Sequence, residues 1–289
     1  MQMVQNMDRL STLLNHFSPS IQQVMYRELP KNKACSYSHQ PVADLYLIAK
    51  GSLSIATENE AATELVAYDV IWLPGGGEHQ LTAGEQGAEF VHIQLQFGSA
   101  HLNPLLETLP EMIVLQADTD ESGELRPLVE LMIAESQSQR CGNALVLARL
   151  AEVLLVKLLR FLMGNMVLSQ GVIGGLGDAR LGRSLTAMHD HPEIPWTVQT
   201  LAQEAGMSRT AFSTRFHEVV GYPPGEYLSS WRMRLASEWL SATTQSIAQI
   251  SEKLGYQNEA AFRRAFRKII GKPPGALRKQ SAATSESPL

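Results

Sequence analysis

The sequence has little cysteine and no long apolar run that is free of charge. Its 289 residues include only Cys35 and Cys141, which excludes a fold held together by a framework of disulfides. The start, MQMVQNMDRL, lacks the apolar stretch of a secretory signal. The most apolar run, residues 144–164, carries four charged side chains that are too costly in lipid: Arg149, Glu152, Lys157 and Arg160. We therefore expect a cytoplasmic protein that does not bind membranes.

The chain as a whole also lacks an excess of basic residues, since its formal net charge is −5. The charge is unevenly distributed, however. Residues 1–178 carry 10 Lys and Arg against 20 Asp and Glu, whereas residues 179–289 carry 14 against 9. This asymmetry is expected when only the C-terminal part meets phosphate. The length and the 44% of hydrophobic residues are sufficient for two packed domains.

One segment of the basic part occurs twice, at residues 201–228 and 250–277. The matching positions share one offset of 50 residues and include two phenylalanines, a glycine and a Pro-Pro-Gly run: Phe212 and Phe262, Phe216 and Phe266, Gly221 and Gly271, and residues 223–225 and 273–275. Such self-similarity indicates that one supersecondary unit has been used twice.

Each copy has the parts of a helix-turn-helix. A short apolar helix precedes Gly206 in the first copy and Gly255 in the second, where a tight turn needs a residue that tolerates positive φ. Ser208 and Asn258 are then placed to cap a second helix, whose phenylalanines recur at helical spacing on its inner face. The sequence therefore predicts two helix-turn-helix units.

The outward side chains of the two second helices suit the DNA major groove. Arg can bond guanine with two hydrogen bonds, Ser and Thr can bond several base edges, and Glu can accept from a cytosine amino group. We predict base contacts from Thr210, Ser213, Thr214, Glu259, Arg263 and Arg264. We predict phosphate contacts from Ser208, Arg209, Arg215, Asn258, Arg267 and Lys268. The alternative is a pair of solvated amphipathic helices without a ligand.

With the linker helix at residues 227–240 and the run GYQNEAAFRRAFRK, residues 179–279 resemble the C-terminal domain of AraC/XylS-type bacterial transcription regulators. The resemblance implies two recognition helices that enter successive major grooves on one face of DNA, about 34 Å apart. The family pattern usually has Arg where this chain has Thr214, whereas Arg264 keeps the Arg of the second unit. The first unit is therefore expected to rely more on Ser, Thr and van der Waals contacts.

The N-terminal part changes to a strand pattern between residues 20 and 97. Residues 44–58 are interpreted as two strands around a turn at Lys50-Gly51. Residues 89–97, EFVHIQLQF, alternate strictly, with Val91 and Ile93 on one face and His92 on the other. Many short strands separated by turn residues are typical of a small barrel or jelly roll.

Residues 74–79, PGGGEH, fit the PxGxxH motif of cupins, so the N-terminal region resembles the cupin sensor domain of AraC-type regulators. It is similar to a subgroup that opens with D-x-L-S-x-L-L, here residues 8–14. Enzymatic cupins hold a metal through an HxH motif, which is Tyr37-Ser38-His39 in this chain. His39, His79 and His92 could in principle bind zinc, but the broken pair favours ordinary barrel histidines. We expect no metal and no cofactor.

A barrel of this size can enclose one small ligand. We predict an effector pocket lined by His39, Tyr46, Trp72, His79 and His92. The cysteines are either indifferent thiols or redox sensors. Cys35 follows two lysines whose charge would lower its pKa, and Cys141 lies in a polar stretch where exposure is expected.

The apolar surface of residues 143–163 covers well over half of the predicted helix, more than one globular contact needs. We infer a dimerisation helix, the alternative being a fully internal one; the resemblance implies a dimer as well. We predict a cupin-like sensor domain (1–125), a helical dimerisation region (126–164), a flexible glycine-rich linker (165–178), the double helix-turn-helix domain (179–280) and a disordered tail (281–289).

The predicted fold class is therefore α+β and multidomain, with an N-terminal cupin-like barrel and an all-α C-terminal domain. The predicted function is that of a transcription regulator, not an enzyme, which binds promoter DNA as a homodimer and answers to a small molecule or a redox signal. RNA polymerase is a further expected partner. The competing hypotheses are a metal-dependent cupin enzyme fused to a DNA-binding module and a scaffold protein of the nucleoid.

Overall fold

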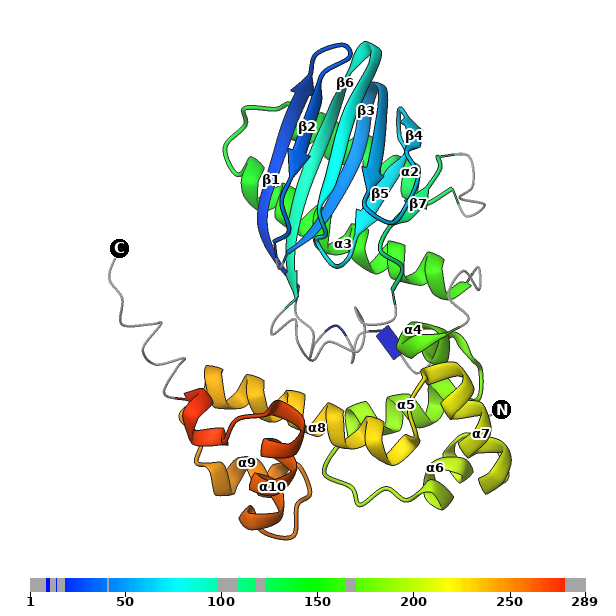
Figure 1. The fold of residues 1–289 in the computed structure, drawn as a ribbon, viewed down its shortest axis with the longest axis vertical. Coiled ribbons are helices and arrows are strands. Elements are labelled where there is room, and N and C mark those ends of the chain that lie inside the picture. Colours follow the sequence, from blue (N-terminus) through cyan, green and yellow to red (C-terminus); the bar gives the residue numbers. More distant parts are fainter. Residues whose placement is uncertain are drawn as a thin grey trace. The chain divides into compact units, whose positions relative to one another are not determined.

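A computed structural model of the chain describes residues 9–10, 14, 19–40, 42–97, 109–117, 123–164 and 170–278. It divides into two compact units, drawn as ribbons in Figure 1. The β unit holds residues 18–100 and 106–167, and the helical unit holds residues 1–17, 101–105 and 168–289. Within the described ranges, every helix is too short or too polar to cross a membrane. The predicted tail at 281–289 lies outside the described residues.

The β unit is built on an antiparallel sheet in the order β1-β6-β3-β5-β7. Its strands are β1 (Pro19–Leu29), β2 (Ala34–Tyr37), β3 (Ala43–Thr57), β4 (Thr63–Val66), β5 (Val70–Leu73), β6 (His79–Phe97) and β7 (Ile113–Leu115). The long strand β6 pairs with β2 along its first part, with β1 along its second part, and with β3 along both. The predicted α+β class with an N-terminal antiparallel, cupin-like sheet is confirmed.

The structure shows one continuous strand, β3, where the sequence predicted a turn at Lys50-Gly51. Gly51 has a φ of 73°, and the register of β3 against β6 shifts on either side of it. A Cβ atom on Gly51 would lie 2.0 Å from the carbonyl oxygen of Gly87, so only glycine fits. The glycine therefore bends β3 through bulges instead of reversing the chain, and the prediction of a turn is wrong.

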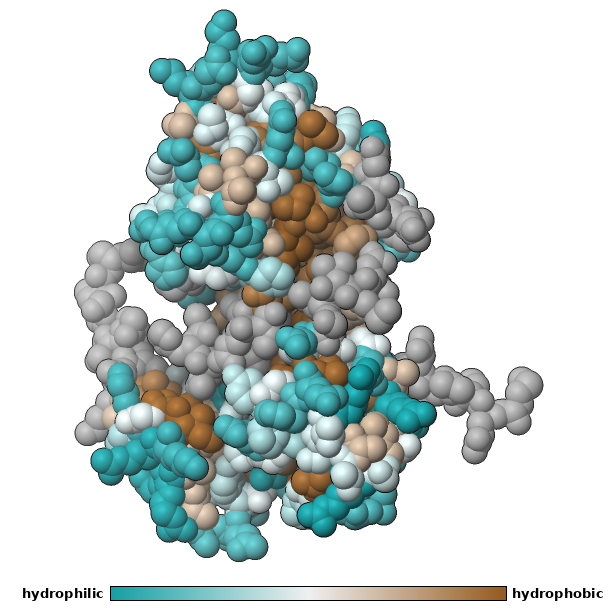
Figure 2. Space-filling view, turned by 45° about the vertical axis from the view of Figure 1, so that its right-hand side comes forward, coloured by the Kyte–Doolittle hydropathy of each residue, from teal (hydrophilic) through white to brown (hydrophobic). Residues whose placement is uncertain are grey.

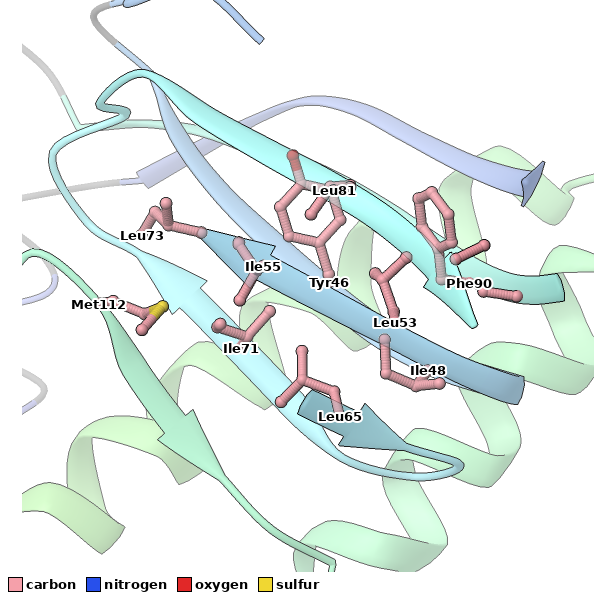
Figure 3. Packing of buried hydrophobic residues seen from close by; sticks show 12 residues of the cluster. Tyr46, Ile48, Leu53, Ile55, Leu65, Ile71, Leu73, Leu81, Phe90 and Met112 are labelled. Carbon is pink, nitrogen blue, oxygen red and sulfur yellow. The ribbon is translucent and has the colours of Figure 1, made fainter. Parts of the chain in front are cut away.

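The two faces of the sheet are covered differently. One face carries a cluster of buried side chains, mostly from the strands themselves, which Figure 3 shows from close by. Two helices, α2 (Leu125–Ser136) and α3 (Asn143–Gly164), pack along the other face (Figures 1 and 3). Because both faces are covered, all four residues of β5 are buried. This explains why β5 lacks the alternation of a half-exposed strand.

The structure shows a helix where the sequence predicted a flexible linker. Residues 171–177 form a helix, α4 (Gly171–Gly177), in which Val172, Ile173 and Leu176 are fully buried. A Cβ on Gly175 would lie 2.7 Å from the side chain of Leu185 and 3.0 Å from that of Val220. The glycines thus allow close helix packing, so the linker prediction is wrong for these residues. Residues 165–169 lie outside the described part.

The two predicted helix-turn-helix units are α6 (Val198–Glu204) with α7 (Arg209–Val220), and α9 (Ile247–Lys253) with α10 (Glu259–Ile270). The helix α8 (Pro224–Ala242) connects them, and α5 (Leu181–Asp190) precedes the first. The matched phenylalanines Phe212, Phe216, Phe262 and Phe266 are all fully buried, as their spacing predicted. Burial of each contributes about 1.5–3 kcal/mol to the stability of its unit.

The ends of α7 and α10 follow from local sequence. Ser208 Oγ accepts a hydrogen bond from the N–H of Ala211 at 3.3 Å, and Asn258 Oδ1 accepts one from the N–H of Ala261 at 2.8 Å. Gly221 ends α7 in the left-handed conformation, with a φ of 89°, and the equivalent glycine ends α10. The predicted caps and stops are confirmed.

Candidate functional site

The outward face of α7 carries small polar side chains. Thr210 and Thr214 are exposed, Ser213 is half-buried, and Arg209 is exposed at the first turn. They lie opposite the buried phenylalanines of the same helix, so this face is presented by packing on the other side. The arrangement offers hydroxyl groups that can donate to or accept from base edges. The roles of these residues as base and phosphate contacts remain predictions.

The outward face of α10 is much more basic. Arg263 Nε donates to Glu259 Oε1 at 2.6 Å, an exposed i,i+4 pair of the kind that contributes only about 0.3–0.5 kcal/mol. Breaking this pair therefore costs little. Arg263 is then available to a base edge or a phosphate, and Glu259 to a base-edge donor. Arg264, Arg267 and Lys268 are exposed on the same helix. The surface presents a concentration of positive charge, which favours binding to a nucleic-acid backbone.

The capping residues keep hydrogen-bond donors for a ligand. The oxygens of Ser208 and Asn258 accept from the first turns of α7 and α10, respectively. The hydroxyl hydrogen of Ser208 and the amide NH₂ of Asn258 are donors, which the caps do not use. Both residues also lie at a helix N-terminus, and the partial positive charge there favours an anion such as phosphate.

The structure places Arg215 differently from the other predicted phosphate contacts. Its Nη2 donates to Asp178 Oδ2 at 3.1 Å, which joins α7 to the junction between α4 and α5. The other oxygen of Asp178 accepts from the N–H groups of Arg180 and Leu181 at 2.8 and 3.0 Å. Burial alone would raise the pKa of Asp178, but these hydrogen bonds and the charge of Arg215 outweigh it, so the pKa is lowered. Asp178 is therefore a carboxylate at neutral pH.

One cation that the sequence analysis did not single out connects the two helix-turn-helix units. Arg232, on α8, donates to the carbonyl oxygens of Pro192 and Ile194 at 2.7 and 2.8 Å. Its guanidinium also lies 5.6 Å from the centre of the Tyr256 ring, beside α9. These contacts join the segment before α6 to the turn of the second unit. Neither a motif nor a periodicity marks such a residue, because its partners are backbone atoms far away in sequence.

The β unit contains a buried polar cluster on the same face of the sheet as the core in Figure 3. Tyr46 and His79 are joined by a hydrogen bond of 2.7 Å, and His92 and Asp44 by another of 2.7 Å. The ring of Tyr37 stacks on that of His79 with centres 4.9 Å apart. In Figure 3, Tyr46 extends from β3 toward β6. We call these five residues the polar cluster.

The hydrogen bonds of the polar cluster determine which ring atoms donate and which accept. His79 Nδ1 lies 2.8 Å from the carbonyl oxygen of Gly77 and must donate to it, so its Nε2 accepts from the Tyr46 hydroxyl. His92 donates from Nε2 to the Asp44 carboxylate, whereas its buried Nδ1 has no partner among the described residues. Burial raises the pKa of Tyr37 to about 12 and that of Tyr46 further, so both stay protonated at neutral pH.

Two predicted pocket residues lie elsewhere. Trp72 pairs with Leu45, whereas Tyr46 pairs with Ile71, so Trp72 faces the opposite side of the sheet from the polar cluster. The placement of Trp72 in the pocket is therefore wrong. His39 is exposed and lines an open hollow beside Glu58, Glu78 and Glu111.

Metal binding through the predicted histidines meets a geometric obstacle. Both ring nitrogens of His79 already have hydrogen-bond partners, and His39 does not belong to the polar cluster. In the part of the chain that the structure describes, no three His, Cys, Asp or Glu side chains are grouped so that they could hold a metal ion.

The two cysteines are both exposed and not joined by a disulfide. Cys35 lies on β2 two residues before Tyr37, so the two side chains lie on the same face of the sheet. It therefore lies at the edge of the polar cluster. Cys141 lies two residues before Asn143, the first residue of α3. A redox role for either thiol remains a prediction.

The helix α3 has one face on its own unit and a second apolar face in solvent. Leu147, Leu154 and Leu158 are fully or nearly fully buried, whereas Leu145 and Val153 are 64% and 46% exposed. Figure 2 shows apolar surface on the β unit among hydrophilic side chains. The excess of apolar surface predicted from the sequence is thus present in the fold.

Comparisons with known proteins match two separate parts of the chain. A family model described as Cupin matches residues 8–164, more than half of the chain, and one described as a helix-turn-helix domain matches residues 201–280. A putative AraC-like transcription regulator of Streptomyces lividans is 33% identical over 184 residues, which are 63% of this chain and 60% of that protein.

Two further similarities differ in extent. The HTH-type transcriptional regulator AlkR of Acinetobacter baylyi is 26% identical over an alignment of 310 residues that covers 95% of this chain and 100% of that protein. Among solved structures, the DNA-binding domain of the global transcriptional factor AdpA in complex with a target DNA is 28% identical, with a TM-score of 0.36. That match covers 38% of this chain and 100% of the other.

Proposed function

Because this chain belongs to the cupin family and is an AraC-type transcription regulator with a C-terminal helix-turn-helix domain, we propose that it binds promoter DNA through α7 and α10 in response to a signal received in its β unit. The observation that carries the proposal is the pair of capped helices that present polar and basic side chains opposite buried phenylalanines. Two such helices suit two successive major grooves.

The two helices have different tasks in this proposal. The hydroxyl-rich face of α7 reads base edges, and the arginines and lysine of α10 combine base reading with phosphate contacts. Most of the salt-dependent affinity therefore comes from α10, because each phosphate contact releases a bound counterion. The predicted contacts of both helices are part of the proposal.

We propose the polar cluster as the place where the signal acts. Nδ1 of His92, which has no partner among the described residues, can accept a hydrogen bond from an effector, and the exposed Cys35 lies on β2 two residues from Tyr37. An effector changes DNA binding only if it binds two arrangements of the protein with different affinity. In this proposal the cupin domain is a sensor and not a catalyst.

We also propose that the active form is a homodimer and that RNA polymerase is a partner at the promoter. The exposed apolar face of α3, with Leu145 and Val153, is the surface offered to the second copy. Exposed apolar patches of this kind commonly mark protein interaction sites.

The test is selection of bound DNA from a genomic library by the purified full-length protein. We expect enrichment of a sequence with two half-elements about 10 base pairs apart, one helical turn. The selection is repeated with a thiol reductant and with peroxide or hypochlorite, so that a redox signal becomes visible. If the full-length protein enriches no sequence under either the reducing or the oxidising condition, DNA binding by these faces is refuted.

A further inference from the structure

The first described residues of the chain belong to the helical unit, although the chain then continues into the β unit. Arg9 Nη1 donates to the carbonyl oxygen of Leu176 at 2.9 Å and to that of Asp178 at 3.4 Å. Leu10 is 5% exposed and so contributes an apolar anchor. A Cβ on Gly182 would lie 2.7 Å from Arg9 Nη1, so the glycine on α5 leaves the space that the guanidinium fills.

This contact satisfies a local need of the helical unit. The last carbonyl groups of a helix have no partner within it and carry partial negative charge, which a cation at that end stabilises. Arg9 supplies both a donor and a positive charge at the end of α4. Because α4 packs against α5 and α7, the guanidinium supports a helix on which the recognition helix rests.

The same junction also holds the recognition helix directly. The backbone carbonyl of Asp178 accepts from Arg9, while its side chain accepts from the N–H groups at the start of α5 and from Arg215 of α7. Three segments that are far apart in sequence therefore meet at one residue: the start of the chain, the α4–α5 junction and the recognition helix of the first unit.

We propose that Arg9 and Asp178 are positioning residues for the recognition helix α7 of the first helix-turn-helix unit. The inference rests on the proposed DNA-binding function.

The experiment compares full-length variants on the element recovered by selection and on two versions of it, each with one half-element scrambled. Arg264→Ala identifies the half-element that α10 reads, so the other belongs to α7. The variants are Arg9→Ala, Arg9→Lys and Asp178→Asn, which keeps the cap oxygen but removes the charge. Arg180→Ala, an exposed arginine beside the same junction, is the matched control for charge.

We expect Arg9→Ala to weaken binding to the intact element by about 3- to 10-fold, the loss of one charged hydrogen-bond donor. The loss should disappear on the element whose α7 half is scrambled and remain on the other. Arg9→Lys should recover part of the affinity, and Arg180→Ala should bind as the parent protein does. Unchanged binding by Arg9→Ala, or an equal loss on both scrambled elements, overturns the proposal.

A second measurement tests the coupling through Asp178. In an Arg215→Ala background, Arg9→Ala should have a smaller effect than in the parent protein, because one of the two contacts through which it acts on α7 is gone. Losses that simply multiply refute the coupling. If the parent protein binds no selected element at all, the proposed function fails instead, and the two failures remain distinguishable.

Discussion

Replacement of Arg264 by alanine gives the sharpest test of how the second recognition helix works. The side chain is exposed on α10, on a face fixed by the burial of Phe262 and Phe266 behind it. If Arg264 bonds one guanine through two hydrogen bonds, its loss costs about 1–3 kcal/mol on that base pair. Since 1.4 kcal/mol corresponds to a factor of ten, affinity for the selected element should fall by about 5- to 150-fold.

The loss should depend on sequence. Elements that carry another base pair at the step read by Arg264 bind more weakly already, so the alanine variant should bind them about as well as the parent protein does. The assay is fluorescence anisotropy with duplexes that carry each base pair at each position, at several salt concentrations. Arg267→Ala is the control, and it should weaken all sequences alike while the slope of log affinity against log salt falls by about 0.9.

The reasoning is refuted if Arg264→Ala behaves as that control is expected to behave. A uniform loss on every duplex, with the same decrease in salt slope, would show that Arg264 contacts a phosphate. The specificity of the second unit would then have to come from Glu259 and Arg263, which hold each other in the free protein.

Three further predictions concern stability, assembly and sensing. Asn258→Ala should destabilise the helical unit by about 1 kcal/mol and lower its melting temperature by several degrees, whereas Asn258→Asp should retain the cap; equal melting of all three proteins would contradict this. Val153→Asp should convert a dimer to a monomer in analytical ultracentrifugation, while Val66→Asp, which charges another exposed apolar position, should not; an unchanged dimer would move the interface elsewhere. If the signal is an oxidant, Cys35→Ser should abolish the change in DNA affinity that hypochlorite causes, and a response that persists in this variant but not in Cys141→Ser would assign sensing to the other thiol.

The helix-turn-helix units were predictable because their determinants are local. A serine or asparagine three residues before an N–H group caps a helix, and a glycine that accepts positive φ ends it, wherever the helix lies. The buried phenylalanines follow from helical period alone. The residues that hold α7 in place were not predictable, because Asp178 acts through a side chain 37 positions away in sequence.

The errors in the β unit and at the linker have a common physical reason. At Gly51 the choice between a turn and a bend depends on whether a second strand with Gly87 lies opposite, which the local sequence does not determine. The glycines of α4 are flexible in isolation, but contacts to Leu185 and Val220 order them. In β5 every residue is buried, so no alternation indicated which face Trp72 occupies.

The contact of Arg9 with Leu176 has a consequence for how the chain is made. The two residues are 167 positions apart, and the whole β unit is synthesised between them. Arg9 therefore leaves the ribosome long before its acceptors, and this contact can form only after the β unit has been synthesised.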